Sequence, residues 1–165
     1  MRRDREKKRT LSQTSGSNLK TEGLTVGHVL EGRSPIVFSI TPEESLGDAV
    51  VVLRDKGIGA LVVTDADGAL CGILSERDIV RKLADTPGQT LPQKVGDVMT
   101  EDVKTCSPND TVVSVLQTMN TGRFRHMPVT DPSGLIGMIT IGDVVGFRLS
   151  ELEHETLQLK QLIVG

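Results

Sequence analysis

"GILSERDIV" occupies Gly72–Val80, and "GMITIGDVV" occupies Gly137–Val145. Both stretches consist of a glycine, two apolar residues, a hydroxyl residue, two spacers, an aspartate and two β-branched residues. The second stretch begins 65 positions after the first. A pattern of this length that occurs twice indicates an internal repeat, which has to be identified before any fold is assigned.

The repeat continues upstream of these two stretches, in the same order. "ALVVTDADG" at Ala60–Gly68 matches "HMPVTDPSG" at His126–Gly134, which begins 66 positions later. The sequence therefore contains one unit of about sixty residues twice. Two shorter matches lie further upstream: "SITPEES" at 39–45 with "TCSPNDT" at 105–111, and "VGHVL" at 26–30 with "VGDVM" at 95–99.

Both units predict the same order of secondary structure. "TPEES" and "SPNDT" each offer a hydroxyl N-cap, a proline at the first helical position and an acid at the third, which predicts a helix start. Two short apolar strands joined by a turn follow, and then a second helix. We therefore predict an α/β (α+β) fold of two β-α-β-β-α repeats, packed by pseudo-twofold symmetry through their sheets. The predicted buried helix positions are Leu46, Ala49, Val50 and Leu53, and then Val112, Val115, Leu116 and Met119.

Composition and charge divide the chain into four parts. We expect a basic flexible arm at 1–22, the first repeat at 23–88, the second repeat at 89–149 and a helical extension at 150–165. The net charge is -3, which gives no overall attraction to nucleic acid or to a membrane surface. No apolar run is long enough for a membrane span or typical of a signal peptide, so we expect a cytoplasmic chain without a membrane partner.

The hydroxyl and aspartate of each nine-residue stretch allow two interpretations. Ser75 with Asp78, and Thr140 with Asp143, have the spacing of a capping box, which bonds backbone N–H groups at a helix start. A carboxylate there can also accept two hydrogen bonds from a vicinal diol such as that of ribose, beside N–H groups that favour anions. The two interpretations are compatible, because the hydroxyl can cap the helix while the carboxylate faces a cleft.

The second repeat alone carries a cluster of cations before its first hairpin strand. Arg123, Arg125 and His126 lie in "GRFRHMPV", and the planar fork of arginine and the imidazole N–H suit phosphate. The alternative is that these side chains are only solvated at a strand edge. The two clefts expected between the repeats therefore differ in charge. The corresponding residues of the first repeat are Gly57, Gly59 and Ala60.

These features resemble a tandem pair of CBS domains, also called a Bateman module, over about 24–149. The two nine-residue stretches carry the G-h-h-[ST]-x-x-D signature of that family, and "RFRHMPV" resembles its basic stretch. The resemblance implies a regulatory module that binds an adenosine compound and has no catalytic activity. AMP is the first expectation, and ADP, ATP, an NAD-type dinucleotide such as NADH, and S-adenosylmethionine are the alternatives.

The resemblance also implies how two binding sites are assembled. Each site takes its ribose acid from one repeat and its phosphate-binding residues from the other. The second site keeps its acid but lacks cations, so it should favour adenosine or a weakly held nucleotide. The first site is expected to contain Ser39, Ser75, Asp78, Arg125 and His126, and the second Gly59, Ala60, Thr105, Thr140 and Asp143.

A homodimer and an unidentified protein target are the implied partners. An apolar stripe in the C-terminal extension could serve as a dimer contact or dock on the chain's own core. The alternative function is a nucleic-acid-binding protein that uses the basic arm with Arg123 and Arg125, although few aromatic residues are present to stack on bases. An enzyme that acts on a nucleotide is a third possibility. The stripe consists of Leu149, Leu152, Thr156, Leu159 and Ile163.

Overall fold

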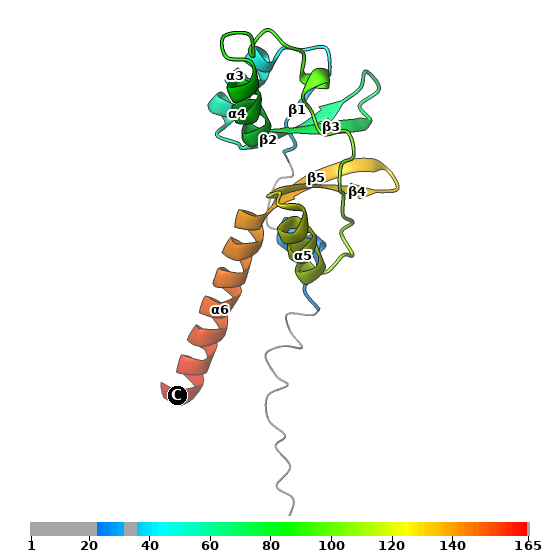
Figure 1. Cartoon of the computed structure of the whole chain (residues 1–165). Coiled ribbons are helices and arrows are strands. Elements are labelled where there is room, and N and C mark those ends of the chain that lie inside the picture. Colours follow the sequence, from blue (N-terminus) through cyan, green and yellow to red (C-terminus); the bar gives the residue numbers. More distant parts are fainter. Residues whose placement is uncertain (1–22, 32–35, 165) are drawn as a thin grey trace, which may run out of the picture.

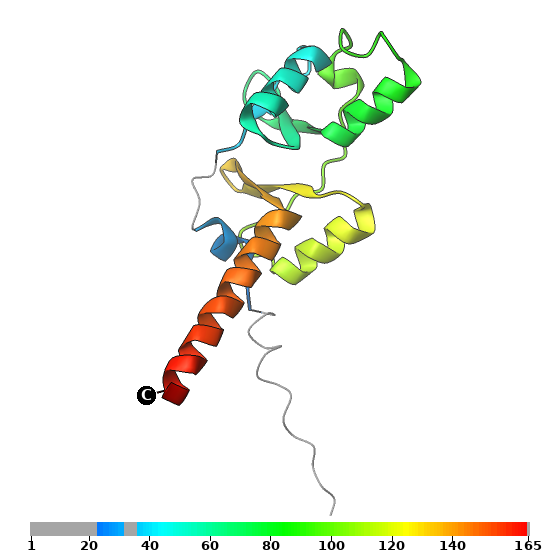
Figure 2. The ribbon, with the colours of Figure 1, turned by 90° about the vertical axis from the view of Figure 1, so that its left-hand side faces the viewer.

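Two small sheets face each other between outer helices (Figure 1 and Figure 2). The structure is a computed structural model that describes residues 23–31 and 36–164, so the arm predicted at 1–22 lies outside the described residues. The predicted mixed fold of two α+β repeats is confirmed. Its elements are α2 (Val26–Leu30), β1 (Ser39–Ile40), α3 (Leu46–Lys56), β2 (Ala60–Thr64), β3 (Leu70–Ser75), α4 (Glu76–Asp85), the 3-10 turn η1 (Val95–Asp97), α5 (Val112–Gly122), β4 (His126–Asp131), β5 (Gly134–Thr140) and α6 (Ile141–Val164).

The two sheets differ in their first strand. In the first repeat, β1 pairs in parallel with β2, and β2 pairs antiparallel with β3. In the second repeat, β4 pairs antiparallel with β5, and the predicted first strand is reduced to a single bridge at Cys106. The Cys106 N–H donates to the Pro128 carbonyl at 3.0 Å, and the Thr130 N–H donates to the Cys106 carbonyl at 2.8 Å. The β-α-β-β-α order is thus complete in the first repeat and shortened in the second.

The helices α3 and α5 begin four residues later than predicted. Their N-caps are Ser45 and Thr111, whereas the sequence pattern placed the caps at Thr41 and Ser107. Instead, the Thr41 N–H donates to the Glu44 carboxylate at 2.7 Å, which closes a turn before the helix. Side chains of this kind can bond to the nearby backbone outside a helix, so the same residues suit a turn and a helix start equally well.

The predicted helix faces are largely correct. Both helices direct their apolar residues into the cores, but Val50 is exposed and Leu116 is only half-buried. In the described part of the chain, no helix is both long and apolar enough to cross a membrane. The buried predicted positions are Leu46, Ala49, Leu53, Val112, Val115 and Met119.

Each core takes a segment from beyond its own repeat. Helix α2 precedes the first repeat's sheet, yet Val26 packs in the core of the second repeat. The turn η1 precedes the second repeat's sheet, yet Val95 packs in the core of the first. The backbone bonds match: the Val26 N–H donates to the Asp110 carbonyl at 2.9 Å, and the Val95 N–H donates to the Glu44 carbonyl at 2.8 Å. Packing therefore crosses the boundaries predicted at 23–88 and 89–149, and neither core is complete within its own repeat.

Candidate functional site

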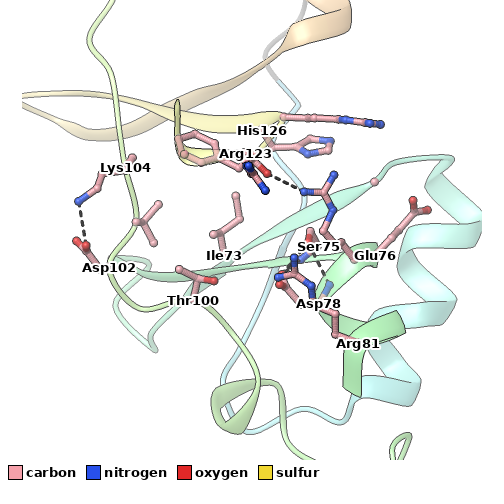
Figure 3. Close-up of a pocket in the computed structure, with 16 residues that line it drawn as sticks. Ile73, Ser75, Glu76, Asp78, Arg81, Thr100, Asp102, Lys104, Arg123 and His126 are labelled. Carbon is pink, nitrogen blue, oxygen red and sulfur yellow. Dashed lines mark hydrogen bonds and ion pairs between the residues drawn. The ribbon is translucent and has the colours of Figure 1, made fainter. Parts of the chain in front are cut away.

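A cavity of about 490 Å³ lies between the two repeats (Figure 3). One wall is formed by the end of β3 and the start of α4, and the facing wall by the turn from α5 into β4. The segment 100–104, which connects the repeats, also lines the cavity. A molecule bound there would contact both repeats and their connection at once.

Ser75 and Asp78 form a capping box on the first wall. The Ser75 N–H and hydroxyl both donate to Oδ2 of Asp78, at 2.8 and 2.7 Å, and the Asp78 N–H approaches the Ser75 hydroxyl at 3.4 Å. The capping interpretation is therefore correct. These bonds use one carboxylate oxygen, and among the described residues Oδ1 of Asp78 has no hydrogen-bond donor. The geometry leaves Oδ1 able to accept from a ligand hydroxyl, as the second interpretation requires.

The turn from α5 into β4 carries the cations of the facing wall. Arg123 caps α5 in the left-handed conformation, with φ 57°, where the first repeat has Gly57 with φ 62°. A side chain in this conformation costs about 1–2 kcal/mol relative to the right-handed form. The Arg123 carbonyl accepts a hydrogen bond from the guanidinium of Arg77 at 2.7 Å, which ties the two repeats together. Arg125, two residues on, is exposed and also lines the cavity.

His126 occupies the contact between the two repeats. A Cβ added to Gly59 would lie 3.2 Å from two atoms of the imidazole ring, so the ring packs directly against that glycine. Burial lowers the pKa of His126, and the charge of Arg125 adds to this effect. The carboxylates of Asp143 and Glu76 oppose it. The lowered pKa favours the neutral imidazole, and an anion bound beside it would raise the pKa again.

The connecting segment reaches the cavity because of a glycine in the repeated stretch. A Cβ on Gly72 would clash with the sulfur of Met99 and would lie 3.3 Å from the Thr100 carbonyl. Beside it, Ile73 and Thr100 exchange two backbone bonds, at 3.0 and 2.9 Å. This close approach fixes Thr100 against β3, and the residues that follow it, including Val103, line the cavity. The residues of this segment were not predicted from the sequence, and the glycine was the signal that could have indicated them.

Cations outnumber acids around the cavity. Five lysine or arginine side chains line it, against three aspartates or glutamates. The ammonium of Lys104 is already paired with Asp102, at 2.9 Å. The remaining excess of arginine makes the cavity attractive to an anion with more than one negative charge. The cations are Arg77, Arg81, Lys104, Arg123 and Arg125, and the acids are Glu76, Asp78 and Asp102.

The cavity brings together most of the residues predicted for the first site. Ser39 does not line it, and lies at an exposed position in β1, paired with Val62. Gly59, which was assigned to the second site, lines this cavity beneath His126. Ala60, also assigned there, is buried. The predicted residues found in the cavity are Ser75, Asp78, Arg125 and His126.

The remaining residues predicted for the second site do not line this cavity. Thr140 and Asp143 form a second capping pair at the start of α6, with N–H to oxygen distances of 3.0 Å in both directions. Thr105 is exposed just before the bridge at Cys106. The second site therefore stays a prediction.

The family assignment follows from comparison with known proteins. The CBS domain family matches the chain twice, at residues 26–85 and 95–150. The chain belongs to this family, as a tandem pair of CBS domains. The two matched segments include both capping pairs and the cations at the turn from α5 into β4.

Relatives and solved structures agree with this assignment. A mitochondrial CBS domain-containing protein of Arabidopsis thaliana, CBSX3, is 39% identical over 129 residues, which are 76% of this chain and 63% of that protein. Inosine-5'-monophosphate dehydrogenase of Nitrosopumilus maritimus is 34% identical over 65% of this chain, but only 21% of the enzyme is covered. The chain thus spans less than two thirds of these relatives.

Two solved structures show the likeness in three dimensions. The CBS-domain protein ATU1752 of Agrobacterium tumefaciens superimposes with a TM-score of 0.74 at 40% identity, covering 76% of this chain and 94% of that one. The CBS domain pair of protein MJ0100, in complex with 5'-methylthioadenosine and S-adenosyl-L-methionine, gives a TM-score of 0.66 at 24% identity, covering 74% and 98%. The second likeness concerns the fold alone.

Proposed function

We propose that this chain is a regulatory module that binds an adenine nucleotide in the cavity between its repeats, without catalysing a reaction. CBS pairs are regulatory modules that bind adenosine ligands. The observation that carries the proposal is the arrangement of charge: a capping aspartate from one repeat faces arginines and a histidine from the other. A ribose with a phosphate on one side matches this arrangement.

A nucleotide can be placed in the cavity group by group. The ribose diol would donate to Oδ1 of Asp78, and the phosphate would lie against Arg125 and His126. The base would lie against Ile73 and Val103, which supply apolar surface. The volume falls within the range of about 300–1,000 Å³ that is usual for small-molecule pockets. AMP is the first ligand that we propose, and the additional arginines leave ADP and ATP as the alternatives.

Ligand binding would change the arrangement of the two repeats relative to each other. A ligand that contacts both walls favours the conformations in which the walls have the right separation. The Arg125 carbonyl accepts from the Ile141 N–H at 3.1 Å, so the cation turn is bonded directly to the start of α6. A homodimer or a protein target that contacts α6 would sense the change. We propose a cytoplasmic location, although the Arabidopsis relative is named as mitochondrial.

Thermal unfolding tests the proposed function. A ligand at 100 times its Kd adds about 2.7 kcal/mol to the free energy of unfolding. For a domain of this size we expect Tm to rise by about 5–10 °C. AMP, ADP, ATP, NADH and S-adenosylmethionine should be compared by differential scanning fluorimetry. No shift with any of the five would contradict the proposal, and conversion of ATP during the incubation would indicate an enzyme instead.

The pH dependence of binding tests the role of His126. We expect AMP to bind several-fold more tightly at about pH 6 than at about pH 8, because a phosphate favours the protonated imidazole. His126→Gln should show a weaker pH dependence, while the titration of AMP itself affects both proteins equally. In the ligand-free protein the sign is opposite: because its pKa is lowered by burial, His126 reduces the free energy of unfolding as the pH falls below its ordinary 6.5. Calorimetric titration of AMP at several pH values compares the wild type with this variant. Identical pH profiles would contradict the contact between His126 and the phosphate.

A further inference from the structure

The helix α6 extends far beyond the domain that it begins in (Figure 1 and Figure 2). Its first turns pack on the core of the second repeat through Val144 and Phe147. The apolar stripe predicted in the C-terminal extension does not dock on the chain's own core, because its leucines and isoleucine are exposed. The exposed apolar residues of the stripe, with Val145 one turn before it, are Val145, Leu149, Leu152, Leu159 and Ile163.

The spacing of the stripe is that of a coiled coil. From Val145 to Ile163 the intervals alternate between four and three residues, with Thr156 at the one position that is not apolar. This repeat of about 3.5 residues keeps one seam facing a partner helix, as the a and d positions of a heptad do. The seam lies about 100° around the helix from Val144, so the contact with the domain leaves it accessible. The d positions are Val145, Leu152 and Leu159, and the a positions are Leu149, Thr156 and Ile163. Leucine at d together with the β-branched Ile163 at a favours two strands.

The charges beside the seam are complementary to a second copy of the same helix in parallel orientation. In a parallel pair, each g position meets the e position five residues later on the other helix. Arg148 would then meet Glu153 of a second copy, and Glu155 would meet Lys160. Both pairs have opposite charges. An antiparallel pair centred on Thr156 would instead place Glu155 against Glu155.

We propose that α6 pairs with α6 of a second copy as a parallel two-stranded coiled coil along this seam. The proposal does not depend on nucleotide binding. It places the two copies of the cation turn at the same end of the dimer, because that turn is bonded to the start of each α6.

Two leucines with similar exposure give a matched pair of variants. Leu159 is 61% exposed and lies in the seam, whereas Leu157 is 57% exposed and lies on another face of the same helix. Leu159→Ala should raise the Kd of the dimer about tenfold or more, because the burial of two leucines is lost. Leu157→Ala should leave the Kd unchanged. Sedimentation equilibrium measures both. A wild-type chain that stays monomeric, or an equal effect of the two variants, would overturn the proposal.

Charge exchange tests the parallel orientation. Glu155→Lys and Lys160→Glu should each weaken self-association several-fold, because each places like charges together twice in its dimer. A mixture of the two variants should associate as tightly as the wild type, since opposite charges face each other again. In an antiparallel dimer, where position 155 faces position 155, Glu155→Lys would replace one like-charge pair by another and leave self-association unchanged, and that result would overturn the proposal.

A cross-link tests the pairing of α6 even if the CBS domains also form a dimer without it. Leu159→Cys should form a disulfide between two copies under mild oxidation, and Leu157→Cys should not. Cys71 and Cys106 are present in both variants and in the wild type, which serves as the blank. Equal cross-linking of the two variants would overturn the proposal. The Tm shift with AMP should be measured in the same proteins. A failure of the coiled coil can then be distinguished from a failure of the proposed nucleotide binding.

Discussion

The Asp78→Ala variant is expected to bind both AMP and adenosine about a hundredfold more weakly than the wild-type chain. Both ligands carry the ribose diol, and a hydrogen bond to a charged group is worth about 1.5–3 kcal/mol. The same carboxylate caps α4, so its removal also lowers the free energy of unfolding by about 1 kcal/mol. Calorimetric titration well below Tm measures the affinity, and chemical denaturation measures the stability.

Asp48→Ala is the matched control for this experiment. Asp48 accepts from the N–H and the hydroxyl of Ser45, at 3.1 and 2.6 Å, in the same capping arrangement at the start of α3. It does not line the cavity, so its loss should reduce stability and leave both affinities unchanged. Asp143→Ala should spare the tight site. If Asp143→Ala removes the tight site instead, the ribose acid and the cations have been assigned to the wrong repeats.

The repeated stretch predicted the fold because its pattern combines several local preferences. The hydroxyl of Ser75 and the carboxylate of Asp78 each have a role that depends on near neighbours, and both interactions occur in the structure. The cations of the facing wall were also predictable, because Arg125 precedes and His126 begins a strand that the apolar pattern predicted. What could be read from the sequence is therefore what depends on adjacent residues.

The remaining features depend on contacts between distant parts of the chain. Nothing in "VGHVL" indicates that Val26 packs in the core of the second repeat, or that Val95 packs in the first. The segment from Thr100 to Lys104 lines the cavity because it, too, contacts a part of the chain that is distant in sequence. For this reason it was not predicted. Ser39 was assigned to the site through the family resemblance, whereas the cavity takes its third wall from the connection between the repeats.

The second large effect concerns the distinction between a nucleotide and a nucleoside. Arg125→Ala should weaken AMP about tenfold or more and leave adenosine within about twofold, because adenosine has no phosphate. The side chain is exposed in the ligand-free protein, and its backbone carbonyl, not its guanidinium, bonds to the start of α6. Removal of the guanidinium should therefore leave Tm nearly unchanged.

Arg54→Ala provides the control for charge alone. Arg54 is exposed on α3, pairs with Asp55 at 2.8 Å, and does not line the cavity, so its removal should leave AMP affinity unchanged apart from a small long-range effect. Arg125→Lys keeps the charge but loses the planar fork, so part of the AMP affinity should return. Titrations of AMP and adenosine into the three variants complete the test. An equal loss of both ligands in Arg125→Ala would show that Arg125 supports the fold of the cavity and does not hold the phosphate.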